Sequence, residues 1–171
     1  RRALDRFRQA LRIDPTNAAA LAGAGEVAFE VGDYASAQRY LRAVEPASSH
    51  TLELRAVADL VLTSDPLRPG LALRQRHERV MVGFRRAMEV LDECARKQPA
   101  NSGALESLRT EASGLEPELA LTRVRRAPES IDAGLNLIYR IEQRTAEACG
   151  QGSAFDRALL LIGRRHDADR Q

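Results

Sequence analysis

The feature that most constrains this sequence is a pattern of small and apolar residues that repeats after 34 residues, from Ala3 to Ala37. The pattern occurs as Ala3, Phe7 and Ala10, and again as Ala37, Leu41 and Val44. Steps of three and four residues place such side chains on one face of an α-helix. Each helix is too short to be stable alone, so its apolar face must be buried against a neighbouring helix. The chain is therefore expected to begin as a stack of short amphipathic helices.

A two-helix unit connects the two copies of this pattern. Its first helix is expected over residues 18–31 and carries one stripe of small and apolar residues: Leu21, Ala24, Gly25 and Ala28. Gly32 can adopt the left-handed conformation that ends a helix. Asp33 is a favourable N-cap for a second helix over residues 34–45.

Two segments of this region resemble the tetratricopeptide repeat. GDYASAQRYL matches the turn and second helix of such a repeat, and ALRIDP matches its end. The resemblance covers residues 3–45. It implies that residues 3–14 are the second helix of one repeat and that residues 18–45 form a whole repeat, so further repeats are expected upstream. It also implies a solenoid in which the first helix of each repeat lines a concave face that binds peptides.

The pattern changes after a third unit, in which Leu54, Val57, Ala58 and Val61 keep the spacing of a first helix. The segment SDPLRPG follows, and its two prolines break the helix and favour an extended linker. Longer helices are expected at about residues 73–98, 103–115, 128–148 and 154–165, followed by a frayed tail at residues 166–171. The sequence thus predicts an all-α fold, with a tetratricopeptide-type solenoid fragment in residues 1–65 and a helical bundle packed on it in residues 66–171.

Charge and composition exclude several classes of partner. The net charge is +2 and only 4% of the residues are aromatic, whereas nucleic-acid binding favours a strongly basic surface and stacking aromatics. The longest apolar run, residues 158–162, is far too short to span a membrane. Lys97 is the only lysine among many arginines, which favours a GC-rich bacterial genome as the source.

The sequence offers no recognisable catalytic or metal-binding constellation. His50, His77 and His166 are scattered, and none has the spacing to Cys, Asp or Glu that a zinc site needs. The segment GQGSAF lacks the lysine of a phosphate loop, and its Ser153, together with Asp156, is expected to cap the last helix. Basic residues around Arg74 to Arg86 are interleaved with acids, which is typical of a solvated helix face. We therefore expect no cofactor, no metal and no enzymatic activity.

A partner-binding groove is expected on the helix at residues 18–31. The face opposite its packing stripe carries Ala19, Ala22, Glu26, Phe29 and Glu30. Some tetratricopeptide domains bind a terminal carboxylate with lysine and asparagine at such positions, but Ala22 and Glu26 stand there in this chain. The resemblance therefore implies a small acidic surface with one aromatic residue. The alternative is that Phe29 packs into a preceding repeat.

The two cysteines are expected to lie at the same end of a three-helix unit. Cys94 is in the last turn of the helix ending near residue 98, and Cys149 follows the helix ending near residue 148. One helix separates them, and two chain reversals leave the outer helices roughly parallel. A disulfide requires Cα atoms about 4.4 to 6.8 Å apart. Such a bond would indicate an oxidising compartment such as the bacterial cell envelope or periplasm; the alternative is two reduced cysteines in a cytoplasmic core.

These observations favour a non-enzymatic interaction or scaffold module that binds a protein or peptide partner. They leave two alternatives open. One is a substrate-positioning or accessory domain of a larger enzyme whose catalytic part lies outside this sequence. The other is a structural unit that assembles with itself.

Overall fold

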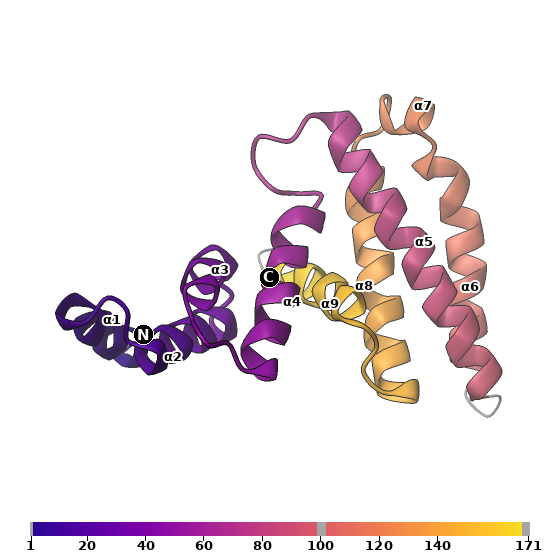
Figure 1. The fold of residues 1–171 in the computed structure, drawn as a ribbon. Coiled ribbons are helices and arrows are strands. Elements are labelled where there is room, and N and C mark those ends of the chain that lie inside the picture. Colours follow the sequence, from indigo (N-terminus) through magenta and orange to yellow (C-terminus); the bar gives the residue numbers. More distant parts are fainter. Residues whose placement is uncertain (1, 99–101, 169–171) are drawn as a thin grey trace. The chain divides into compact units, whose positions relative to one another are not determined.

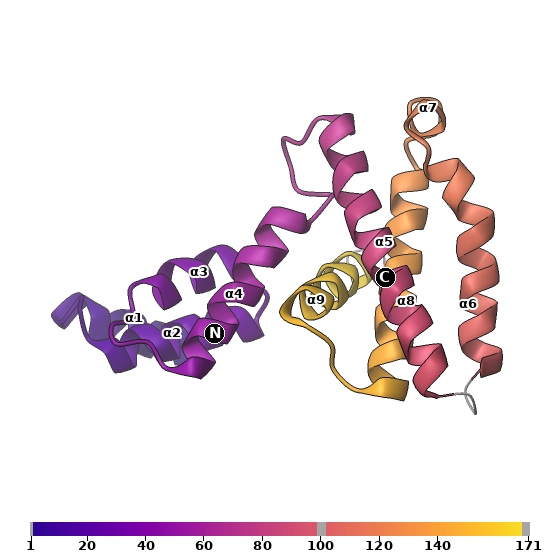
Figure 2. The same ribbon diagram turned by 45° about the vertical axis from the view of Figure 1, so that its right-hand side comes forward.

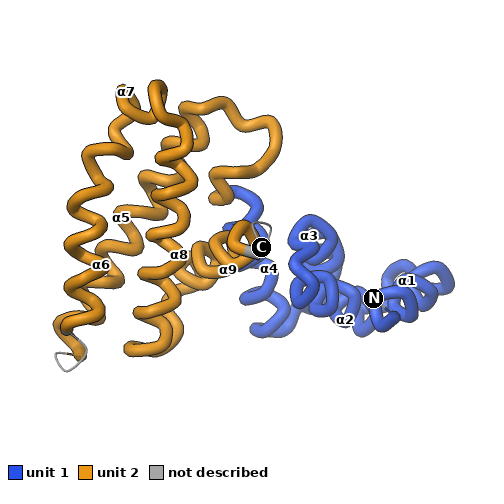
Figure 3. The backbone as a smooth tube through the Cα atoms, turned by 180° about the vertical axis from the view of Figure 1, so that it is seen from behind, with its two compact units in different colours: residues 1–63 blue, residues 64–171 orange. Residues whose placement is uncertain are grey.

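The computed structural model describes residues 2–98 and 102–168, and the regular structure within these ranges is entirely helical (Figure 1). The predicted all-α fold is confirmed. The chain divides into two compact units, Arg1–Thr63 and Ser64–Gln171 (Figure 3), whereas the sequence suggested a division after residue 65.

The first unit consists of four helices: α1 (Arg2–Ile13), α2 (Ala18–Glu30), α3 (Tyr34–Arg42) and α4 (Ser49–Ser64), whose last residue begins the second unit. α2 packs between α1 and α3. Small residues allow these close contacts, since a Cβ atom on Gly25 would come within 2.5 Å of the buried Leu41 side chain on α3. Gly23 likewise lies directly under the ring of Phe7 on α1.

The turns of the first unit follow the sequence signals. The side chain of Asn17 caps α2 by accepting a hydrogen bond of 2.9 Å from the Ala20 amide. Gly32 has a φ angle of 78° and ends α2. Asp33 then caps α3 by accepting a hydrogen bond of 3.1 Å from the Ser36 amide. The predicted roles of Gly32 and Asp33 are confirmed.

The described part of the second unit contains four longer helices and two short elements. Its elements are α5 (Leu73–Lys97), α6 (Ser102–Leu115), the 3-10 helix η2 (Glu116–Leu119), α7 (Leu121–Val124), α8 (Ser130–Cys149) and α9 (Ala154–Ala168). α5 and α8 lie side by side and run in the same direction, with α6 antiparallel beside them (Figures 1 and 2). α9 packs on α8. The core is a cluster of mostly aliphatic side chains from α5, α6, α8 and α9, with contributions from η2 and α7, and it includes the fully buried Leu91, Leu137 and Ile141.

The prediction of a frayed tail over residues 166–171 is wrong for residues 166–168. α9 continues through His166 to Ala168. His166 is held there because its Nε2 atom lies 2.9 Å from the Oδ1 atom of the buried Asp65, at the start of the loop before α5. Residues 169–171 lie outside the described part of the chain.

Candidate functional site

The face of α2 that the sequence singled out is accessible along its length. Ala19 and Glu30 are exposed, and Ala22 and Phe29 are partly buried. The side chain of Glu26 retains 44% of its accessible surface, so it is not buried against α3. The structure therefore leaves two carboxylates and part of an aromatic ring exposed on one helix.

Phe29 is held in place by a residue of its own repeat. Its ring meets that of Tyr34 edge to face, with the centroids 5.4 Å apart and the planes at 82°. Tyr34 is the first residue of α3 and is buried. An edge-to-face contact of this kind fixes the ring orientation. Phe29 thus combines a fixed ring with partial exposure.

Polar contacts link α4 to the helices before it. The Nε2 atom of His50 lies 3.9 Å from Glu26 Oε1, and both side chains are exposed. Further along α4, Asp59 accepts a hydrogen bond of 2.5 Å from Gln38 and one of 2.9 Å from Arg42, both on α3. The acidic face of α2 therefore approaches the first turn of α4 through the contact of Glu26 with His50.

The other two histidines make structural contacts. His77 Nε2 donates a hydrogen bond of 2.9 Å to the carbonyl oxygen of Leu119, which joins α5 to η2. His166 pairs with Asp65, whose pKa is lowered because the hydrogen bonds from His166 and the Leu67 amide outweigh the opposing effect of burial. Among the described residues no group of three His, Cys, Asp or Glu side chains could hold a metal ion.

The glycine- and serine-rich segment before α9 forms a helix cap. The amide and hydroxyl of Ser153 donate hydrogen bonds of 2.7 and 2.9 Å to Asp156 Oδ2, and the Asp156 amide donates to Ser153 Oγ at 3.3 Å. This reciprocal arrangement satisfies the first amides of the helix. The amide and hydroxyl of Ser153 are thus engaged by the carboxylate of Asp156.

The basic run on α5 is only partly the solvated face that the sequence predicts. Arg74 pairs with Glu78 at the surface. Arg86 instead donates hydrogen bonds of 2.7 and 3.0 Å to the two carboxylate oxygens of Asp156, whose side chain is only 4% exposed. These hydrogen bonds raise the pKa of Arg86 far above its ordinary range.

A buried acid on α8 was not identified from the sequence. The Glu142 side chain is 3% exposed and belongs to the same face of α8 as Ile138 and Ile141. Burial, together with the nearby charge of Asp156, raises the pKa of Glu142 to about 8. The only available signal was its spacing of four residues from Ile138, and that spacing does not distinguish a buried acid from one at the edge of the stripe.

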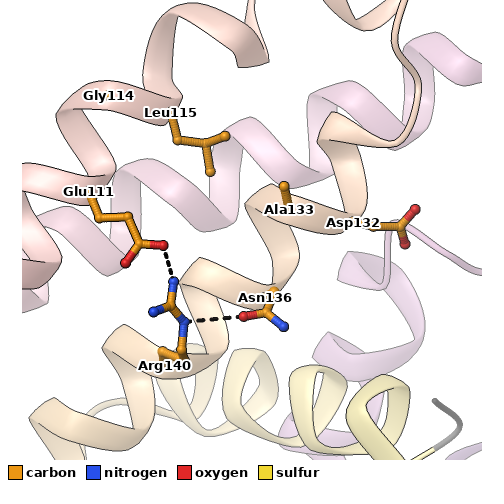
Figure 4. A pocket seen from close by; sticks show the side chains of 7 residues that line it. All are labelled: Glu111, Gly114, Leu115, Asp132, Ala133, Asn136 and Arg140. Carbon is orange, nitrogen blue, oxygen red and sulfur yellow. Dashed lines mark hydrogen bonds and ion pairs between the residues drawn. The ribbon is translucent and has the colours of Figure 1, made fainter.

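The outer face between α6 and α8 is hollowed by a shallow depression of about 510 Å³ (Figure 4). Glu111 on α6 forms an ion pair across it with Arg140 on α8. Arg140 also donates a hydrogen bond of 3.2 Å to Asn136. These polar groups in the lining of the depression therefore pair with one another and form an ion-pair network between α6 and α8.

The structure joins Cys94 and Cys149 by a disulfide, with the Cα atoms 5.8 Å apart. Cys94 is buried in the last turn of α5, and Cys149 is the final residue of α8. α5 and α8 run in the same direction (Figure 1), so the helix ends that carry the two cysteines lie at the same end of the pair. The bond closes one end of the second unit.

No helix in the described ranges is long and apolar enough to cross a membrane. No curated protein and no solved structure matches the chain significantly. Residues 1–58 match a family model described as a tetratricopeptide repeat. This match, together with the helical repeat described above, supports a tetratricopeptide repeat protein, with the repeat in about the first third of this chain.

Proposed function

We propose that this chain is a non-enzymatic interaction module that uses the exposed face of α2 to bind a basic peptide or protein segment. Tetratricopeptide repeats generally mediate protein–protein interactions. The observation that carries the proposal is the placement of Glu26 and Glu30 beside the fixed ring of Phe29. Exposed carboxylates attract a basic partner and orient it, and a partly exposed ring supplies an apolar contact.

Reversal of both charges in an E26R/E30R variant is expected to weaken binding of a fluorescein-labelled peptide rich in arginine and leucine. At low ionic strength we expect a loss of about tenfold, since each exposed pair contributes roughly 0.2 to 1 kcal/mol and a repulsion replaces it. Fluorescence anisotropy measures the affinity, and circular dichroism checks that the helices are retained.

The matched control is an E116R/E129R variant, which changes the net charge equally at two exposed acids of the second unit. It should bind the peptide as the wild type does. Equal losses in both variants would show that only net charge matters, and unchanged binding in E26R/E30R would exclude the α2 face.

We further propose that the chain comes from a bacterium and works in an oxidising compartment such as the cell envelope. The disulfide supports this location, because such bonds persist mainly outside the reducing cytoplasm. The strong preference for arginine over lysine supports the source. Alkylation of the protein from its native cells, followed by mass spectrometry without reductant, should find no reactive thiol; two alkylated cysteines would place it in the cytoplasm.

A further inference from the structure

The carboxyl group of Glu142 is enclosed within the second unit without a complete set of hydrogen-bond partners. Its side chain is 3% exposed, and its Oε1 atom has no hydrogen-bond partner. The neighbouring hydroxyl of Thr145 donates to the backbone carbonyl oxygens of Ile141 and Glu142 at 2.9 and 3.2 Å, so it is already engaged. A buried carboxylate in such surroundings is costly unless it is neutralised.

Among the described residues, the cation that acts on Glu142 is Arg86, and its guanidinium group is already engaged with another acid. Arg86 on α5 makes a two-point contact with Asp156 on α9 and a further contact of 3.3 Å with Glu89. Asp156 also accepts two hydrogen bonds from Ser153. Asp156 is thereby stabilised as a carboxylate, and a second negative charge at Glu142 would lie buried beside it.

Charged side chains on the outer face of α8 and on the facing side of α6 pair with one another. Arg140 of α8 pairs with Glu111 of α6, and Arg144 pairs with Glu147 of α8 itself. The charges that act on Glu142 are those of Asp156, which disfavours its ionisation, and Arg86, which partly offsets this effect. Burial and Asp156 together raise the pKa of Glu142 from its ordinary value of 4.5 to about 8.

We propose that Glu142 is a proton-dependent switch for the C-terminal helix: as a neutral acid it allows α9 to pack on α8, and loss of its proton loosens α9. α9 is the element affected because it carries Asp156, the nearest negative charge, within its first turn. The contact is otherwise close, since Gly163 of α9 lies against Tyr139 of α8. The switch thus acts first on α9, which contributes Leu159 to the core cluster.

The direction of the pH effect follows from proton linkage. Between pH 4.5 and about 8, the packed state holds a proton that the open state has released. The equilibrium constant for opening therefore rises about tenfold for each pH unit in this range and levels off above it. The stabilising contribution is complete below pH 4.5 and is lost as the pH rises through about 8.

Hydrogen exchange of the α9 amides, measured by mass spectrometry and corrected for the intrinsic rate at each pH, tests this switch. In the wild type, the opening constant of α9 should rise about tenfold per unit from pH 6 to pH 7.5, while the amides of α5 change less. In E142Q, which is isosteric and has no proton to lose at position 142, the rise should be much smaller than in the wild type, and the comparison is repeated in an H166Q background because His166 of α9 pairs with Asp65. E147Q, an exposed acid on the same helix, should behave as the wild type does.

The ¹³C chemical shift of the Glu142 carboxyl group gives a second readout on the wild-type chain that does not depend on a variant. A titration midpoint well above 7 supports the proposal, and a midpoint near 4.5 overturns it. Identical pH dependence in wild type and E142Q would also overturn it. A parallel loss of protection in α5 and α9 would exclude a switch that acts on α9 alone.

Discussion

Replacement of Cys94 by alanine and Cys149 by serine is expected to lower the free energy of unfolding of the second unit by about 4 kcal/mol. The disulfide joins residues 55 positions apart, and the chain-entropy model gives about this value for such a loop. Alanine suits position 94 because that side chain is buried, whereas serine suits the exposed position 149. Urea unfolding of the full chain, monitored by circular dichroism, measures the change.

The wild-type chain provides its own control for this loss. Addition of a reducing agent should lower its stability by a similar amount and should leave the double variant unchanged. A loss of less than about 1 kcal/mol in both experiments would show that α5 and α8 stay together without the bond, and that the reduced, unfolded chain retains structure.

Replacement of Arg86 by alanine is expected to cost about 3 to 5 kcal/mol, which is typical when one partner of a buried ion pair is removed. Asp156 would then be left 4% exposed without its guanidinium partner, next to the buried Glu142. The same urea experiment on R86A measures this loss. R109A is the matched control, because Arg109 pairs with the half-exposed Asp92. This substitution should lower the free energy of unfolding by less than about 1 kcal/mol.

The pH dependence gives this prediction a specific signature. Burial opposes ionisation of Asp156, but the hydrogen bonds from Arg86 and Ser153 outweigh it and lower the pKa below its ordinary value of 3.8. In the wild type this contribution is present above that value and is lost as the pH falls through the lowered pKa. R86A should therefore lose less stability on acidification than the wild type does. Equal acid sensitivity in the wild type and R86A would show that the hydrogen bonds from Ser153, and not those from Arg86, lower the pKa of Asp156.

Local sequence was sufficient for the order and type of the helices. The 34-residue repeat, the turn at Gly32 and the cap at Asp33 depend on residues within a few positions of one another. Helical periodicity and capping are properties of such short segments, so they are visible without a fold. The long helix expected at 73–98 extends from Leu73 to Lys97 for the same reason.

The residues of the candidate α2 face could be located from the sequence, but their exposure and contacts could not. The positions of Glu26, Phe29 and Glu30 follow from helical spacing. The exposure of Glu26 and the contact of Phe29 with Tyr34 depend on how α3 packs against α2. The cysteines were placed at one end by counting helix reversals, which is a topological argument, whereas their 5.8 Å separation is set by packing.

By itself, the sequence determined a helical repeat followed by longer helices, because those features depend on residues close together in the chain. The tertiary structure alone decided which polar groups are enclosed. Arg86 and Asp156 are 70 residues apart, and Asp65 and His166 are 101 apart. Glu142 becomes a buried acid only because α5 and α9 cover its face of α8. The protonation of such a group depends on charges and burial supplied by distant segments, and no local pattern contains that information.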